Sequence, residues 1–213
     1  MTSMLRTAAR EGYRQSLFAA SRLMGQVAQK PSFLIIGAQK AATTTLSATL
    51  ASHPAICMSL FKEVHYFDLH HKRGKYWYER HFPRKKKGCR LHFEASPYYL
   101  MHPLVPARVF DYDPRMKLVV ILRNPVDRAY SHYQMERKRN HESIGTFQAA
   151  VRHEGERVTD ELDQLAQGKI PKSQAVQRHS YLHRGYYEDQ LRRWLELFAR
   201  DQLHVIDYDH LTR

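Results

Sequence analysis

Four short apolar runs recur along the chain, and the stretches between them have apolar residues at helical spacing. Short runs rich in β-branched and aliphatic residues predict buried strands. Strands that alternate with helices favour a parallel sheet covered on both faces. We therefore predict an α/β fold with three layers, α/β/α, around a central and mostly parallel sheet. Its predicted strands are Phe33–Ile36, Leu91–Glu94, Leu118–Leu122 and Leu203–Asp207.

Three stretches have the periodicity and the end signals of helices. Asn124 and Pro125 supply the residue types preferred at an N-cap and at a first helical position, whereas His53-Pro54 stops an earlier helix. The last helix places large apolar residues on one face, which we expect to pack in the core. The predicted helices are Thr43–Ala51, Pro125–Lys138 and Ser180–Ala199, with the apolar face at Tyr187, Leu191, Trp194, Leu195 and Phe198.

The segment from His141 to Gln177 is polar and charge-rich, with one break at Gly168–Pro171. We predict a helical excursion and a mobile loop on the surface. Surface loops on a rigid scaffold are where binding residues concentrate, so this segment is a suitable place for contacts to an acceptor.

The charge balance limits the class of partner. The chain of 213 residues has 34 Lys and Arg against 21 Asp and Glu, a formal net charge of +13. Such a field favours anionic partners: nucleic acids, acidic glycans, anionic lipids or phosphorylated cofactors. The charge is spread along the chain apart from the run Arg84–Lys87, and no Gly/Ser/Tyr-rich low-complexity segment occurs, which argues against nucleic acid.

Cysteine content and hydropathy bear on the compartment. Cys57 and Cys89 are too few for a disulfide framework, and no CxxC or Cys/His motif of metal-ligand spacing occurs, so two free thiols in a reducing compartment are expected. No run approaches the ~20 apolar residues that a membrane-spanning helix needs. Residues 1–30 form a basic amphipathic segment that caps the domain or contacts a membrane surface, an organelle transit peptide being the weaker alternative. We predict a cytoplasmic protein.

The stretch GAQKAATTTL, which follows the first predicted strand, resembles a phosphate-binding loop but departs from the nucleotide-hydrolase pattern. When Gly37 is aligned with the first glycine of that pattern, Ala42 replaces the second glycine and Thr43 replaces the lysine. Lys40 lies inside the loop instead. The strand Leu118–Leu122 ends in the cation Arg123 rather than in the acidic residue that would organise magnesium. A P-loop kinase of small molecules is therefore the weaker hypothesis.

The loop retains the groups that hold an anion. These are its backbone N–H groups, the positive end of the following helix, and the hydroxyls of Thr43, Thr44 and Thr45. Threonines at a helix start also serve as simple caps, and the loop alone does not separate these alternatives. A second anion site is expected where Arg123 ends its strand, with Ser131 eight residues later in the next helix.

Several motifs together resemble one family. GAQKAATTTL is similar to the 5′-phosphosulfate loop of sulfotransferases, and LRNPVDRAYSHY to their 3′-phosphate motif, with the same spacing from Arg123 to Ser131. KEVHYFD, YWYERHFP and FEASPYYL resemble the branch that sulfates glycans, including heparan sulfate enzymes. The resemblance implies a P-loop-like fold and the donor 3′-phosphoadenosine 5′-phosphosulfate, without a metal. It places the donor on Gln39, Lys40, Ala41, Ala42, Thr43, Thr44, Thr45, Arg123 and Ser131.

The resemblance also implies catalytic roles. Lys40 would stabilise the charge that develops on the bridging oxygen as the sulfuryl group leaves. Glu63 occupies the position of the base in the glycan-modifying branch, and His65, two residues later, would lie on the same side of an extended segment and share or tune that role. Glu94 either orients the acceptor or the base, or caps the following turn.

This chain departs from the family in three places. Ala42 replaces the usual loop glycine, so donor binding is expected to weaken if that position requires a positive φ. Ala95 replaces a lysine that is frequent in the heparan-sulfate-like branch, which argues against a heparan-like acceptor. Family members commonly continue past the last predicted strand, so a domain over residues 31–213 is expected to lack the usual C-terminal part.

The sequence therefore supports a sulfotransferase that acts on a hydroxyl of a carbohydrate or glycolipid, without a nucleic-acid partner. The alternatives are the small-molecule kinase and a non-enzymatic anion-binding or membrane-surface module. The last would use the basic N-terminal segment and the Arg84–Lys87 run, and would make Glu63 dispensable.

Overall fold

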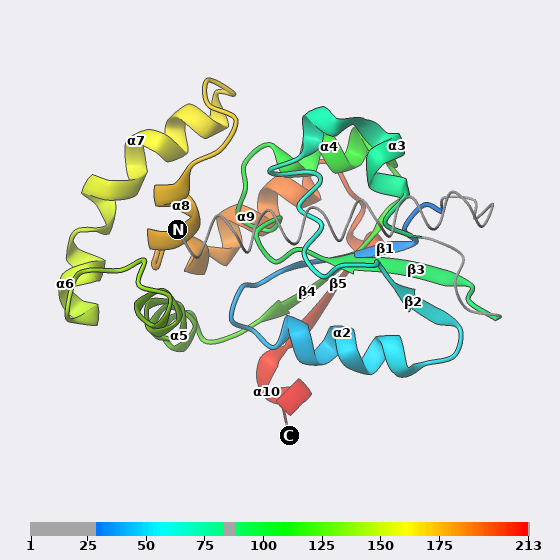
Figure 1. Ribbon diagram of the computed structural model, residues 1–213, viewed down its shortest axis with the longest axis horizontal. Coiled ribbons are helices and arrows are strands. Elements are labelled where there is room, and N and C mark those ends of the chain that lie inside the picture. The colour runs from blue at the N-terminus through cyan, green and yellow to red at the C-terminus, as the bar shows by residue number, and fades with distance from the viewer. Residues whose placement is uncertain (1–28, 83–87, 213) are drawn as a thin grey trace.

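The fold is a five-stranded parallel sheet with helices on both faces (Figure 1). The computed structural model describes residues 29–82 and 88–212. The strand order is β2-β3-β1-β4-β5, and every neighbouring pair is parallel. The predicted α/β architecture is thus confirmed. The strands are β1 (Phe33–Gly37), β2 (Ile56–Met58), β3 (Leu91–Ala95), β4 (Lys117–Leu122) and β5 (Leu203–Asp207).

The helices form two layers and a side group. Helices α3, α4 and α9 lie on one face of the sheet and α2 on the other, while α5 to α8 gather beyond the carboxyl ends of β1 and β4 (Figure 1). The α-helices are α2 (Thr43–Ser52), α3 (Gly74–Glu79), α4 (Val105–Tyr112), α5 (Pro125–Lys138), α6 (Phe147–Arg152), α7 (Glu154–Ala166), α8 (Gln174–His179), α9 (Tyr187–Leu195) and α10 (Tyr208–Thr212). The 3₁₀ turns are η1 (His71–Arg73), η2 (His183–Gly185) and η3 (Arg200–Gln202).

The four predicted strands and the predicted helices that begin at Thr43 and Pro125 lie where the sequence predicts them. All four predicted strands form, and the side chain of Asn124 caps α5 by accepting from the N–H groups of Val126 and Asp127. Among the strands, sequence reasoning missed the edge strand β2, and among the helices it missed α3, α4 and α10. The three residues of β2 are only half-buried, so they give neither a long apolar run nor an alternating pattern.

The predicted continuous helix from Ser180 to Ala199 is wrong. The structure has the turn η2, a break at Tyr186, and then the shorter α9. The buried carboxylate of Glu154 accepts from the N–H groups of Leu182 and His183, which ends regular helical bonding there. These contacts join segments 28 and 29 residues apart, so local periodicity could not reveal them.

The apolar face predicted for residues 187–198 packs in the core except at one position. Trp194 is fully buried and its indole N–H donates to the carbonyl oxygen of Leu100 at 3.4 Å, while Phe198 packs beside it. Tyr187 and Leu191 are partly buried against the same core. Leu195, however, remains 42% exposed and does not belong to the core face.

The expectation of two free thiols is wrong, because Cys57 and Cys89 form a disulfide. They are 32 residues apart, but β2 and the segment that leads into β3 run side by side and bring their Cα atoms to 6.0 Å. The spacing of the two cysteines in the sequence did not predict this pairing.

Other expectations fall outside the described residues. The basic segment 1–30 is described only at Gln29 and Lys30, where the Gln29 N–H donates to the carbonyl of Phe82 and the Lys30 ammonium lies over the Tyr112 ring. The Arg84–Lys87 run also lies outside. Within residues 29–82 and 88–212, no helix is long and apolar enough to span a bilayer.

Trp194 and Leu195 offer a matched test of the core. We expect Trp194→Ala to lower the free energy of unfolding by about 3–5 kcal/mol, because it deletes a fully buried side chain and leaves a cavity. Leu195→Ala, next to it and exposed, should cost less than about 1 kcal/mol. Urea unfolding followed by circular dichroism measures both, and similar losses in the two variants would contradict this packing.

Candidate active site

The loop between β1 and α2 is held close to the core. Gly37 ends β1 so near to Leu100 that a Cβ on it would lie 2.7 Å from the Leu100 Cβ, so only glycine fits. Farther along, Lys40 and Ala42 have left-handed backbones, with φ of 71° and 57°. The expected requirement at Ala42 is thus present: this alanine occupies a conformation that glycine adopts at lower cost.

The three threonines begin α2, but they do not cap it. The N-cap is Ala42, which provides no side-chain cap, and Thr43 is already the first helical residue. Thr43 is buried, while Thr44 and Thr45 are exposed. The Thr44 hydroxyl accepts from the Lys62 ammonium at 2.5 Å. The first turn of α2 therefore presents backbone N–H groups and hydroxyls without a capping side chain across its end.

Two predicted cations meet at this loop. A guanidinium N–H of Arg123 donates to the Lys40 carbonyl at 3.1 Å, and the guanidinium stacks 4.6 Å from the centre of the Tyr208 ring. Burial lowers the pKa of Lys40, and the nearby charges of Arg139 and Arg123 lower it further. An anion bound here would relieve this repulsion between positive charges.

Glu63, His65 and Asp68 form a connected chain of charged groups. His65 Nδ1 lies 2.7 Å from Asp68 Oδ2, and His65 Nε2 lies 3.4 Å from Glu63 Oε2. Asp68 is buried, whereas the Glu63 side chain is 43% exposed and faces the cavity described below. The expected contact between Glu63 and His65 is present, but the predicted extended backbone is wrong. Both residues are left-handed, with φ of 60° and 55°.

The charges in this chain stabilise one another. Burial lowers the pKa of His65, but the Asp68 and Glu63 carboxylates outweigh it and raise this pKa to about 10. Burial raises the pKa of Glu63, but His65 and Lys62 outweigh it and lower this pKa to about 2. At neutral pH, Glu63 is therefore ionised and able to accept a proton, whereas His65 is an imidazolium that cannot accept one.

Glu94 fixes the backbone of this segment. It is fully buried at the end of β3, and its carboxylate accepts from the hydroxyls of Tyr78, Tyr99 and Ser96, each at 2.8 Å. It also accepts from the Val64 N–H at 3.2 Å. Burial raises the pKa of Glu94, while the three hydroxyl donors oppose that rise. Of the two roles left open for it, the geometry favours orienting the Glu63 turn.

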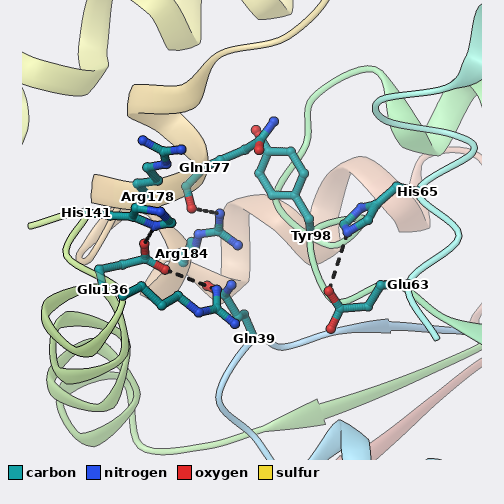
Figure 2. A pocket seen from close by; sticks show the side chains of 10 residues that line it. Gln39, Glu63, His65, Tyr98, Glu136, His141, Gln177, Arg178 and Arg184 are labelled. Carbon is teal, nitrogen blue, oxygen red and sulfur yellow. Dashed lines mark hydrogen bonds and ion pairs between the residues drawn. The ribbon is translucent and has the colours of Figure 1, made fainter. Parts of the chain in front are cut away.

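A cavity of about 240 Å³ opens beside Glu63 and His65. Figure 2 shows these two side chains on one side. Facing them are Glu136 of α5, His141 of the loop after α5, Arg178 of α8 and Arg184 of η2. Three buried polar atoms of its lining have no hydrogen-bond partner among the described residues: Gln39 Oε1, the Tyr98 hydroxyl and Arg184 Nη1. A polar ligand that enters this cavity would find donors and an acceptor already placed.

The predicted residues fall into three groups. Lys40 and Arg123 are in contact, and the loop residues Gln39, Ala41, Ala42 and Thr43 to Thr45 surround the same turn. Glu63 and His65 face the cavity that Gln39 also lines. Ser131 is partly exposed on α5, and within the part of the chain that the structure describes it makes no hydrogen bond to the loop.

Sequence reasoning missed several residues of the site. Asp68 ends the KEVHYFD motif, and its spacing of three from His65 was an available signal. Tyr98 lies in the FEASPYYL motif. No local pattern distinguished Arg139, Arg178 and Arg184, because only the packing of the side group of helices turns them toward the cavity. From the 141–177 segment, His141 and Gln177 line the cavity, and the expected acceptor contacts of this segment stay a prediction.

Comparison with known families decides the identity of the domain. A family model described as "Sulfotransferase domain" matches residues 30–213. The chain belongs to this sulfotransferase family. The family membership predicted from the motifs is thereby confirmed.

Individual relatives are also sulfotransferases. The human bifunctional heparan sulfate N-deacetylase/N-sulfotransferase 2 is 31% identical over 188 residues, covering 85% of this chain and 20% of the relative. Human heparan sulfate glucosamine 3-O-sulfotransferase 5 is 30% identical, and the match covers 89% of this chain and 51% of the relative. A sulfotransferase crystal structure from Alicyclobacillus acidocaldarius matches with a TM-score of 0.72 and 30% identity. The match covers 87% of this chain and 76% of that structure's chain. The chain thus spans about a fifth of the bifunctional relatives and half of the 3-O-sulfotransferase.

The Asp68 carboxylate should control the protonation of His65. In Asp68→Asn the loss of its negative charge lowers the raised pKa of His65, so the imidazolium is lost at a lower pH than in the wild type. The paired pKa of Glu63 should rise from about 2, because its cationic neighbour is weakened. NMR titration of the histidine ring measures this change.

A conservative surface substitution provides the control for that titration. Asp160→Asn lies on the exposed side of α7 and should leave the His65 titration unchanged. If Asp68→Asn and wild type titrate alike, Asp68 does not hold the proton on His65.

Proposed function

We propose that this protein transfers a sulfuryl group from 3′-phosphoadenosine 5′-phosphosulfate to a hydroxyl of a carbohydrate or glycolipid acceptor. The observation that carries the proposal is the juxtaposition of two arrangements: an anion-binding loop with Lys40, and the Glu63–His65–Asp68 chain beside a polar cavity. Gln39 connects them, because it lies in the loop and lines the cavity.

The donor fits the cationic loop. The backbone N–H groups and hydroxyls at the start of α2 would hold the 5′-phosphate, and Arg123 with Ser131 would hold the 3′-phosphate. Lys40 would lie at the bridging oxygen, where charge develops as the S–O bond breaks. The lowered pKa of Lys40 reflects burial and neighbouring cations, and a multiply charged anion would offset that repulsion.

The reaction is an in-line displacement. The acceptor oxygen forms a new bond to sulfur, the bond from sulfur to the 5′-phosphate oxygen breaks, and adenosine 3′,5′-bisphosphate leaves. Glu63 takes the proton of the acceptor hydroxyl, because its carboxylate is ionised and faces the cavity. The cationic His65 ring holds the Glu63 carboxylate in place, and Asp68 orients His65. No metal is assigned to the reaction.

The cavity lining supports an acceptor that carries a negative group near the reacting hydroxyl. Arg139, Arg178 and Arg184 line it together with His141, against the carboxylates of Glu63 and Glu136. Glu136 is already paired with His141 at 2.9 Å and with Arg139 at 3.6 Å. Within residues 29–82 and 88–212, the Arg184 Nη1 and Tyr98 hydroxyl donors have no hydrogen-bond partner, so they would bind oxygen atoms of such a group. These cations would take the place of the lysine contact that is missing at Ala95.

The competing kinase hypothesis lacks the residues that it requires. Thr43 holds the position of the Walker lysine, and β4 leads into Arg123 rather than into a magnesium-binding carboxylate. The non-enzymatic alternative does not account for the Glu63–His65–Asp68 chain beside the cavity. Both alternatives remain outcomes of the experiment below.

The test is sulfate transfer from radiolabelled donor to oligosaccharides, in the presence of a chelator. We expect label in uronate-bearing oligosaccharides and less in neutral oligosaccharides of equal length. Lys40→Ala and Glu63→Gln should each lower turnover at least about 100-fold, since each removes a transition-state charge or the base.

Lys75→Ala, an exposed lysine on α3, is the matched control and should retain full turnover. Failure to label any acceptor, combined with tight magnesium-dependent ATP binding, would favour the kinase. Labelling that survives Glu63→Gln would remove Glu63 from the mechanism but leave the transfer itself established.

Arg123 should act on donor affinity. Arg123→Ala removes a guanidinium that is positioned by its bond to the Lys40 carbonyl and by the Tyr208 ring. We expect adenosine 3′,5′-bisphosphate to bind at least about tenfold more weakly, the loss of a charge-assisted hydrogen bond. Calorimetry measures this affinity, with Arg192→Ala, an exposed arginine on α9, as control. Unchanged affinity in Arg123→Ala would refute the role.

A further inference from the structure

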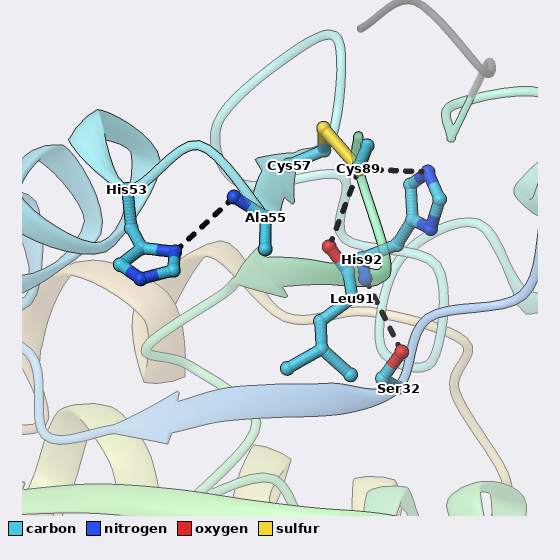
Figure 3. The surroundings of a disulfide bond; sticks show 7 residues. All are labelled: Ser32, His53, Ala55, Cys57, Cys89, Leu91 and His92. Carbon is cyan, nitrogen blue, oxygen red and sulfur yellow. Dashed lines mark hydrogen bonds between the residues drawn. A yellow bond between two sulfur atoms is a disulfide. The ribbon is translucent and has the colours of Figure 1, made fainter. Parts of the chain in front are cut away.

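A second cluster of chemically active side chains lies at the β2 edge of the sheet, away from the candidate active site. Cys57 lies in β2, Cys89 in the segment that leads into β3, and His92 in β3 itself (Figure 3). Cys57 and His92 are register partners across the parallel pair β2–β3. The sulfur atoms and a ring nitrogen of His92 all lie within 4.8 Å of one another.

The spacing of these atoms matches a tetrahedral metal site. Cys89 Sγ lies 3.6 Å from His92 Nε2. Zinc bonds to sulfur at about 2.3 Å and to histidine nitrogen at about 2.0–2.1 Å, so the sulfur–nitrogen edge of a zinc tetrahedron is roughly 3.5 Å. The corresponding sulfur–sulfur edge is about 3.8 Å, which two separate thiolates reach without overlap. The Cα atoms of the cysteines, 6.0 Å apart, already place both sulfurs on the same side.

The backbone holds His92 in position for such a role. Its N–H donates to the Ser32 hydroxyl at 3.2 Å, and its carbonyl accepts from the Ser32 N–H at 2.6 Å. His92 itself is only 6% exposed, so its ring has little freedom to turn away. A ligand whose backbone is fixed by two hydrogen bonds to a neighbouring residue loses little conformational entropy when it binds a metal.

We propose that the reduced chain binds one zinc ion through the thiolates of Cys57 and Cys89 and the Nε2 atom of His92, with water as the fourth ligand. In the oxidised chain the two sulfurs are bonded to each other and the site does not exist. Reduction adds two electrons and two protons to the disulfide and yields two thiols. Zinc then displaces both thiol protons, so its charge is balanced by two thiolates.

The same elements would be joined in both redox states, by the disulfide in the oxidised chain and by zinc in the reduced chain. The disulfide links β2 to the segment before β3, and the zinc ion would link these two and His92 of β3. β2 contributes only three half-buried residues to the sheet edge, so its own packing is weak. A zinc ion would therefore retain the edge strand under conditions that reduce the disulfide. This inference is independent of the proposed transfer reaction.

Cobalt substitution tests the site directly. The protein is reduced with a phosphine, which supplies the two electrons, then freed of reductant under argon and titrated with Co²⁺. We expect one equivalent to produce thiolate-to-cobalt charge-transfer absorption and the visible bands of tetrahedral cobalt, and one equivalent of Zn²⁺ to remove them. The oxidised wild type, with the same fold and no thiolates, should show neither band.

Variants separate the three ligands. Cys57→Ser and Cys89→Ser should each weaken the charge-transfer absorption, and His92→Asn should remove the tetrahedral visible bands. His204→Asn, a strand histidine outside the cluster, should bind cobalt as the wild type does. Circular dichroism of each oxidised or metal-free variant confirms that it is folded.

The proposal fails if reduced wild type gives no charge-transfer absorption at one equivalent. It also fails if the oxidised protein binds cobalt as the reduced protein does. A folded His92→Asn variant with the same cobalt spectrum as the wild type would contradict it as well.

Discussion

The carboxylate of Glu94 is the constraint on which the candidate site depends. It lies fully buried and accepts from three hydroxyls and one backbone N–H, so its oxygen atoms are hydrogen-bonded by the protein alone. Tyr99, one of these donors, in turn accepts from the N–H groups of Tyr66 and Phe67. The segment that contains Glu63 and His65 is therefore bonded to the end of β3 along several residues. Removing one partner would leave a buried charge short of donors, which is costly.

That support allows the site to hold backbone conformations that the residues disfavour. Four of the five non-glycine residues with positive φ in the described chain are Lys40, Ala42, Glu63 and His65. Each left-handed residue costs roughly 1–2 kcal/mol. Lys40 and Glu63 are thus fixed by the surrounding structure rather than by their own preference. Like charges near Lys40 add a further electrostatic cost, which an anionic ligand would reduce.

The comparison of sequence with structure separates local from long-range causes. Helix α5 was predictable to its ends, because Asn124 and Pro125 form a cap from adjacent residues. The helix expected from Ser180 onward failed because a distant carboxylate, Glu154, binds its backbone. The same holds for the cysteines: neither their disulfide nor the proximity of Cys57 to His92 follows from spacing, because β2 and β3 must first pair.

The sequence by itself determined the parallel α/β sheet, the loop after β1, and the motifs that carry Lys40, Glu63, His65 and Arg123. These follow from short-range patterns of apolar residues, caps and motif spacing. Only the tertiary structure decided that Asp68 completes the charged chain, that Arg178 and Arg184 face it across a cavity, and that His65 is held as a cation. The physical reason is that a cavity, a pKa and a paired charge all depend on groups far apart in the chain, whose distances exist only after folding.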